Sequence, residues 1–248
     1  MIPVAVKAVV SAILFQVVLI HPISAQDEMG HDHRIPYFSL VENSFGPDQN
    51  LINGVQYFDR YAGVEGVPYF INIGFMDGEI TIKGKVYKDI KIRYDMYSQN
   101  VELAHDYFYG GQSWLVAVAD HIEAFRIGEF RFIKADLEET GKKFYQVIET
   151  GLFTCYIHWA KRLQPVQNDH FFTHRFSNSK ATFLLEKDGG IKEINSRKVF
   201  VNQFSQVHRK AIKHLLKRNQ FNLRLATPDV LVYHMNAVAN LLNTGGIP

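Results

Sequence analysis

The fold is decided by residues 79–96, EITIKGKVYKDIKIRYDM. Polar and apolar side chains alternate over 79–83 and again over 90–96, and Gly84 marks a tight turn after the first run. A period of two places the apolar side chains on one face of a strand and the polar side chains on the other. Such one-sided strands, joined by short turns, are typical of antiparallel sheets, because parallel strands are usually apolar on both faces.

The same pattern extends through most of the chain. Further strands are predicted at 68–75, 85–87, 101–103, 114–119, 122–127, 130–133, 144–149, 152–159, 171–176 and 182–186. Asp77-Gly78, Lys88-Asp89 and Asp120-His121 are interpreted as turns between them. We therefore expect a mainly β (α+β) fold, in which a long antiparallel meander forms a curved sheet, a barrel or a sandwich.

The last fifty residues change to a helical period. Apolar residues recur at spacings of three and four from Phe200 onward, which predicts an amphipathic helix over 197–219. A second helix is predicted over 228–243, because Thr227 is a good N-cap and Gly245 follows the last apolar residues. We expect both helices to pack on the sheet with their basic side chains in solvent, and a membrane contact through these side chains is not favoured.

The first 25 residues are typical of a cleaved secretory signal peptide. Lys7 precedes an apolar run over 8–20, and Ile23-Ser24-Ala25 offers a cleavage site before Gln26. The run is shorter than the roughly 20 apolar residues that a spanning helix needs, and no Cys near the cut could carry a lipid. We expect a periplasmic or secreted protein with a flexible leader over 26–36 and a single β-rich domain over 37–248.

Composition places the chain among ordinary globular proteins. The 248 residues carry a net charge of +2, which falls by one when the segment with Lys7 is removed. Because this balance is nearly neutral, it gives no support for a nucleic-acid partner. Cys155 is the only cysteine, so an intramolecular disulfide cannot form. Its apolar neighbours indicate a buried small hydrophobic residue rather than a reactive thiol.

Several turn and strand motifs resemble those of one bacterial group. The motifs are NG at 53–54, GVPYF at 66–70, GEITIKGKVY at 78–87 and IRYDMY at 92–97. They are similar to a family of uncharacterised secreted proteins of Bacteroidetes-type bacteria, whose members also end in a Lys-rich helix and a second short helix. The resemblance implies export and a bacterial source. Since no activity is known for that family, it implies no catalytic residue.

The candidate ligand-binding residues are aromatic. They are Tyr107, Phe108, Tyr109 and Trp114, of which the first three precede Gly110-Gly111. Aromatic side chains beside glycines are suited to the rim of a binding surface. The alternative interpretation is that they fill the core and pair across strands.

Histidines and carboxylates offer weaker candidates. His31 and His33 lie in the predicted leader, and His170 and His174 lie four apart in a predicted strand, where that spacing separates them by about 13 Å. We therefore expect no metal and no cofactor. Asp95 lies among aromatic residues, and its carboxylate would need hydrogen-bond partners if it is buried. The alternative is that it faces water.

No nucleophile elbow, phosphate-binding glycine loop or zinc-protease motif occurs in the sequence. We therefore expect an exported, non-enzymatic envelope protein that binds a ligand or a protein partner. One alternative is a periplasmic hydrolase with a His/Asp site assembled from separate strands, which requires a histidine and a carboxylate within about 2.6–3.2 Å. A second alternative is an accessory subunit of an outer-membrane assembly, which predicts an exposed apolar patch.

Overall fold

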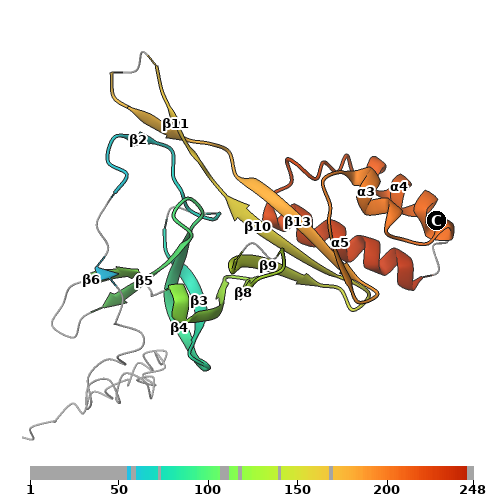
Figure 1. Cartoon of the computed structure of the whole chain (residues 1–248), viewed down its shortest axis with the longest axis horizontal. Helices are drawn as coiled ribbons and strands as arrows, with labels where there is room; N and C mark the ends of the chain where they lie inside the picture. Colours follow the sequence, from blue (N-terminus) through green and yellow to red (C-terminus); the bar gives the residue numbers. More distant parts are fainter. Residues whose placement is uncertain are drawn as a thin grey trace, which may run out of the picture.

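The computed structural model describes residues 55–56, 60–71, 74–106, 112–116, 119–138, 141–167 and 170–244. Within these residues the fold is mainly β, with three helices after the last strand (Figure 1), and the predicted fold class is confirmed. The predicted signal peptide, its cleavage site and the leader lie outside the described residues.

The large sheet contains 11 strands in the order β1-β6-β5-β4-β3-β7-β8-β9-β10-β13-β14. All of its ladders are antiparallel. The meander branches at β3, since β4 to β6 extend from one side of it and β7 to β10 from the other. Among the described residues, no ladder joins β1 to β14, the two ends of this order. The strands are β1 (Val55–Gln56), β3 (Met76–Ile82), β4 (Lys85–Asp95), β5 (Asn100–Asp106), β6 (Gln112–Val116), β7 (Ile122–Ile127), β8 (Phe130–Ala135), β9 (Lys143–Glu149), β10 (Thr154–Ala160), β13 (Lys180–Lys187) and β14 (Gly190–Glu193).

Two predicted turns lie inside strands. Asp77-Gly78 belongs to β3, where a Cβ on Gly78 would lie 2.1 Å from the carbonyl oxygen of Arg126 on β7. The glycine therefore permits a close approach of two backbones and does not end the strand. Lys88-Asp89 belongs to β4, where Asp89 has a φ of 55° and the register with β3 shifts by one residue. This bulge bends the strand without interrupting it.

Two predicted strands are shorter than expected. Among its described residues, the segment 68–75 contributes one bridge, between Tyr69 and Asp95, and Ile71 has a left-handed φ of 63°, which a continuing strand does not adopt. The segment 171–176 is a strand only from His174 onward. Asp120-His121 is not a simple turn but part of a short 3-10 helix over Ala119–His121 that leads into β7.

One continuous core joins the sheet to the helices. Its centre lies on β3, β4, β7 and β8, where the rings of Phe125 and Phe132 stack with centroids 4.5 Å apart. It continues through Phe183 on β13 and Phe153 beside β10 to Phe200 in the first helix. Figure 1 shows the helices gathered next to β10 and β13, away from β3 to β6.

The predicted single helix over 197–219 is wrong, because the chain forms two helices there. They are α3 (Arg197–Asn202) and α4 (Gln206–Arg218), and α5 (Pro228–Asn243) follows as predicted. Ser205 has an extended ψ of 152°, which interrupts the helical hydrogen bonds. The guanidinium of Arg209 donates to the carbonyls of Asn202 and Phe204, so the groups freed by the break are satisfied.

A second, small sheet projects from the molecule. Its order is β11-β12-β2, formed by β2 (Val64–Glu65), β11 (Leu163–Pro165) and β12 (His174–Phe176), and β12 pairs with β2 in parallel. We call β2 and residues 163–176 the arm. Figure 1 shows the arm extending beyond the end of β10, on the side opposite the helices.

Candidate functional site

The predicted aromatic site lies largely outside the described residues. Tyr107, Phe108 and Tyr109 are not among them. Trp114 is on β6 opposite Ala104, and its side chain is not described. The prediction that these four side chains bind a ligand therefore stays a prediction.

The arm exposes two neighbouring aromatic side chains at its far end. Phe171 is 85% exposed and Phe172 is 37% exposed, and both precede β12. The hairpin that carries them is closed by a hydrogen bond from the Val166 amide to the Thr173 carbonyl, 3.1 Å long. The sequence pattern predicted that both rings belong to a strand over 171–176. One feature of the sequence indicates that these two rings do not both belong to the core. Two adjacent side chains on a strand point to opposite faces, so both cannot enter a one-sided core.

The arm is attached to the body through a cluster of three aromatic rings. Phe176 is buried, and its ring centroid lies 5.1 Å from that of Tyr61 and 5.7 Å from that of Tyr97. Tyr61 and Tyr97 lie 6.0 Å apart, and all three pairs have edge-on geometry. Edge-on aromatic pairs stabilise a contact by about 0.5–1.5 kcal/mol beyond the area they bury. The three rings therefore hold the base of the arm in one position.

Asp95 fixes this aromatic cluster to β4. Its buried carboxylate accepts hydrogen bonds from the hydroxyls of Tyr61 and Ser98, the latter 2.7 Å long, and from the amides of Tyr97 and Ser98 at 2.8 and 3.0 Å. Burial and the neighbouring Asp95 charge raise the pKa of the Tyr61 phenol above its ordinary value, so the phenol stays a donor. The expectation that a buried Asp95 would need partners is confirmed, and the alternative that it faces water is wrong.

Polar contacts hold both strands of the arm. The Lys161 ammonium donates to the carbonyl of Val67 at 2.6 Å, and its amide donates to the carbonyl of Met96 at 3.1 Å. Burial lowers the pKa of Lys161, against the opposing effect of the Asp95 charge. Within the arm, Arg175 of β12 and Glu65 of β2 are paired in the sheet and form an ion pair at 2.6 Å. The arm is thus bonded to the body at its base and braced between its own strands.

A buried ion pair lies beside this attachment. Arg93 of β4 and Glu102 of β5 are opposite each other in the sheet, and their side chains meet at 2.5 Å. The guanidinium also lies over the rings of Tyr69 and Phe75, at 4.0 and 4.4 Å from their centroids. Burial raises the pKa of Glu102, and the Arg93 charge opposes this shift. Desolvation of two buried charges offsets their mutual attraction. We therefore assign this pair a structural role, which is to fix the register between β4 and β5.

Histidines do not meet carboxylates in the described part of the chain. No ion pair or hydrogen bond joins the two groups there, and no cluster of three or more metal-ligand residues occurs there. His158 hydrogen-bonds through Nδ1 to the carbonyl of Phe144 at 3.1 Å, and burial lowers its pKa. His170 and His174 are exposed, while His31 and His33 lie outside the described residues.

Cys155 is fully buried in β10, and burial raises the pKa of its thiol. Its interpretation as a small hydrophobic residue of the core is confirmed.

Comparison with known proteins places the chain in no family, since no family model, curated protein or solved structure matches it. Among the described residues, no helix combines the length and the hydropathy that crossing a membrane requires.

Proposed function

We propose that this chain is an exported, non-catalytic protein of the bacterial envelope that binds another envelope protein through the tip of its arm. The observation that carries the proposal is the pair of exposed aromatic side chains, Phe171 and Phe172, on a hairpin that is firmly attached to the body. Export is supported by the signal-peptide pattern over residues 1–25.

The fixed geometry of the arm favours recognition. Aromatic side chains are enriched at protein interfaces, where a few of them supply most of the binding energy. A rigid support lowers the entropic cost of presenting them to a partner. The contacts of Phe176, Asp95 and Lys161 provide such a support, because they anchor the base of the arm to β4 and to the segment before β3.

Charge favours a protein over a lipid surface as the partner. Interfacial membrane binding combines aromatic side chains with basic ones. The described residues of the arm carry two charged side chains, Arg175 and Glu65, and these neutralise each other. An accessory subunit of an outer-membrane assembly is one form of this proposal, in which the partner is a component of that assembly.

The test is capture from envelope extracts followed by reconstitution. Tagged wild-type protein and the Phe171→Ala/Phe172→Ala variant are used as bait, and Leu225→Ala serves as the matched control, because Leu225 is a 79% exposed apolar side chain outside the arm. We expect one partner to be retained by the wild type and by the control. With that partner purified, the double variant should bind at least about 30-fold more weakly, which corresponds to about 2 kcal/mol.

Three results would overturn the proposal. The first is that no partner is retained by the wild type. The second is that the double variant binds the partner as tightly as the wild type. The third is that the arm binds vesicles of phosphatidylcholine and phosphatidylglycerol in a manner that depends on Phe171 and Phe172, whereas no protein does. Mass spectrometry of protein recovered from the cell envelope tests export separately, because the chain should then begin at Gln26.

A further inference from the structure

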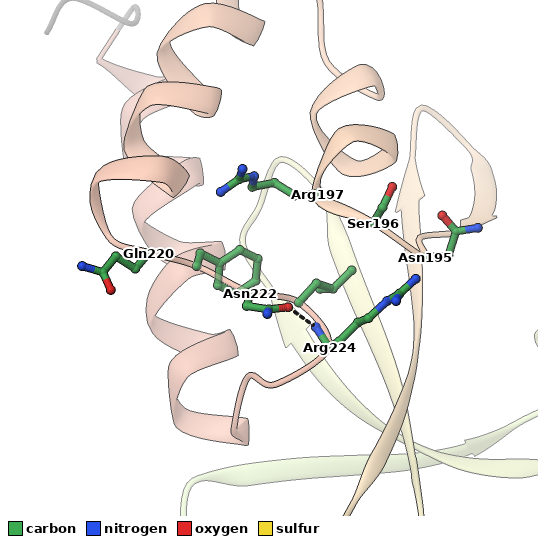
Figure 2. Close-up of a pocket in the computed structure, with 8 residues that line it drawn as sticks. Asn195, Ser196, Arg197, Gln220, Asn222 and Arg224 are labelled. Atoms are coloured by element: carbon green, nitrogen blue, oxygen red, sulfur yellow. Dashed lines mark hydrogen bonds between the residues drawn. The ribbon is translucent and has the colours of Figure 1, made fainter.

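We propose that a hollow between α3 and the α4–α5 loop binds a small organic oxyanion, a molecule with a carboxylate or phosphate group on an apolar body. The hollow has a volume of about 410 Å³ (Figure 2). It is lined by Asn195, Ser196, Arg197, Gln220, Phe221, Asn222, Leu223 and Arg224. This site is distinct from the arm and does not depend on the proposed protein partner.

Local backbone structure creates the hollow. Gln220 has a φ of 51°, so the chain leaves α4 through a left-handed residue and turns back toward α5. The amide of Phe221 donates to the carbonyl of Leu216, which holds the start of the loop against the end of the helix. Asn222 Oδ1 accepts a hydrogen bond from the Arg224 amide at 3.1 Å, drawn in Figure 2. The opposite wall begins at Ser196, whose hydroxyl caps α3 by accepting from the Val199 amide.

The charge of the hollow is positive. Two arginines line it, and none of its lining residues is acidic. Neither Arg197 nor Arg224 forms a side-chain hydrogen bond or an ion pair with another described residue, in contrast to Arg131 and Arg175, which pair with carboxylates. A guanidinium offers five N–H donors in a planar arrangement that fits a carboxylate or a phosphate. The unneutralised charges therefore favour an anionic ligand.

The two ends of the hollow have different roles. Figure 2 shows the side chain of Arg224 directed toward Asn195, whereas Arg197 lies on the other side of the drawn group. We place the oxyanion at the Arg224 end, where Asn195 also lines the hollow. Arg197 contributes positive potential from a greater distance.

Apolar side chains provide a surface for the body of the ligand. Phe221 and Leu223 line the hollow and are mostly buried. The ring of Phe221 is supported from behind by the ring of His234 on α5, with centroids 4.6 Å apart. Pockets for small molecules combine such apolar walls with a few placed polar groups. The ligand is therefore expected to be more than a bare inorganic ion.

The test is a ligand-observed NMR titration of the purified protein with phenylphosphate, benzoate and neutral benzyl alcohol. We expect phenylphosphate or benzoate to bind with a dissociation constant of roughly a millimolar, as is usual for ligands of this size, and benzyl alcohol not to bind. The oxyanion that binds more tightly identifies the ligand class. Arg224→Gln should weaken binding about tenfold and Arg197→Gln about threefold, because the first removes a charge-assisted contact.

Arg218→Gln is the matched control, since Arg218 is an exposed arginine at the end of α4 that does not line the hollow. It should bind both oxyanions as the wild type does, and thermal melts should show that all three variants are folded. The proposal is overturned if neither oxyanion binds, if benzyl alcohol binds equally well, or if Arg218→Gln weakens binding as much as Arg224→Gln.

Discussion

Replacing Gly78 by alanine should destabilise the sheet at its branching strand. A Cβ at this position would lie 2.1 Å from the carbonyl oxygen of Arg126 and 2.4 Å from Cγ2 of Ile92. Ordinary contacts of a Cβ begin near 3.4 Å, so β7 and Ile92 would each have to move by about 1 Å. Overpacking of this kind costs about 1–3 kcal/mol, and the value should be near the upper end because one obstacle is backbone in a ladder.

A smaller effect acts in the opposite direction. Alanine restricts the unfolded chain more than glycine does, which stabilises a protein by about 0.4–1 kcal/mol where the backbone tolerates it. We therefore expect a net loss of about 2–2.6 kcal/mol, or about 4–10 °C in the midpoint of thermal unfolding for a chain of this size. Urea denaturation with fluorescence and circular dichroism measures the loss directly.

Gly74→Ala is the matched control for this measurement. A Cβ on Gly74 would meet no atom within 4 Å, and its φ is not in the left-handed region. This variant should be as stable as the wild type or slightly more stable. The predicted clash is refuted if the free energy of unfolding of Gly78→Ala lies within about 0.5 kcal/mol of the wild-type value, which is the range of ordinary surface substitutions. It is also refuted if both variants lose stability equally.

Three further predictions concern the buried polar groups. Tyr61→Phe should lower the free energy of unfolding by about 1.5–3 kcal/mol, because the buried carboxylate of Asp95 loses a donor. Tyr97→Phe is the control and should change this free energy little, because the Tyr97 ring packs in the same cluster and its hydroxyl makes no hydrogen bond among the described residues. Equal losses of the two variants in urea denaturation would contradict the role given to the Tyr61 hydroxyl. Arg93→Met should cost about 3–5 kcal/mol at pH 7, whereas Lys91→Met, which breaks an exposed pair, should cost at most about 1. Burial raises the pKa of Glu102, the partner of Arg93, and a raised carboxyl pKa favours the folded state at low pH. The stability lost in Arg93→Met should therefore shrink as the pH is lowered from 7 toward the ordinary carboxyl range. Thermal melts in which this loss grows on acidification would contradict the expected sign. Cys155 should react with a thiol reagent only after unfolding, and rapid reaction of the native protein would show that it is not buried.

The fold class could be predicted because alternation is a local property. Each strand carries its own period of two, so the run over 90–96 indicates a one-sided strand whatever its neighbours are. The predicted turn and the predicted helix were wrong where the local structure depends on contacts made by another residue. Gly78 resembles a turn residue in sequence, yet it is required by a carbonyl 48 positions away on β7. The helical spacing of apolar residues continues on both sides of Ser205, yet the helix is interrupted there. The interruption is tolerated because the guanidinium of Arg209 donates to the carbonyls that it frees.

The candidate sites were harder to predict for the same reason. The sequence shows that Asp95 needs partners if it is buried, and it cannot show that one of them is Tyr61, 34 positions earlier. Arg224 lies between the two predicted helices, and no pattern in the sequence distinguishes it from the other basic residues nearby. Its significance depends on the hollow beside it, which two separate segments of the chain create, 195–197 and 220–224.

The arm and the hollow should bind their ligands independently. Figure 1 shows the ladder between β10 and β13 lying between the arm and the helices, and this ladder runs through seven residue pairs to Ala160 opposite Lys180. The arm begins after Ala160, and the hollow begins at Asn195, beyond β14. Coupling between two sites requires an element with two arrangements that both ligands bias. A long ladder with a buried face has one register, because a shift by one residue would turn its apolar side chains to solvent. Phe171→Ala/Phe172→Ala should therefore bind phenylphosphate with the wild-type dissociation constant within about twofold, and a larger change would show that the ladder transmits a rearrangement.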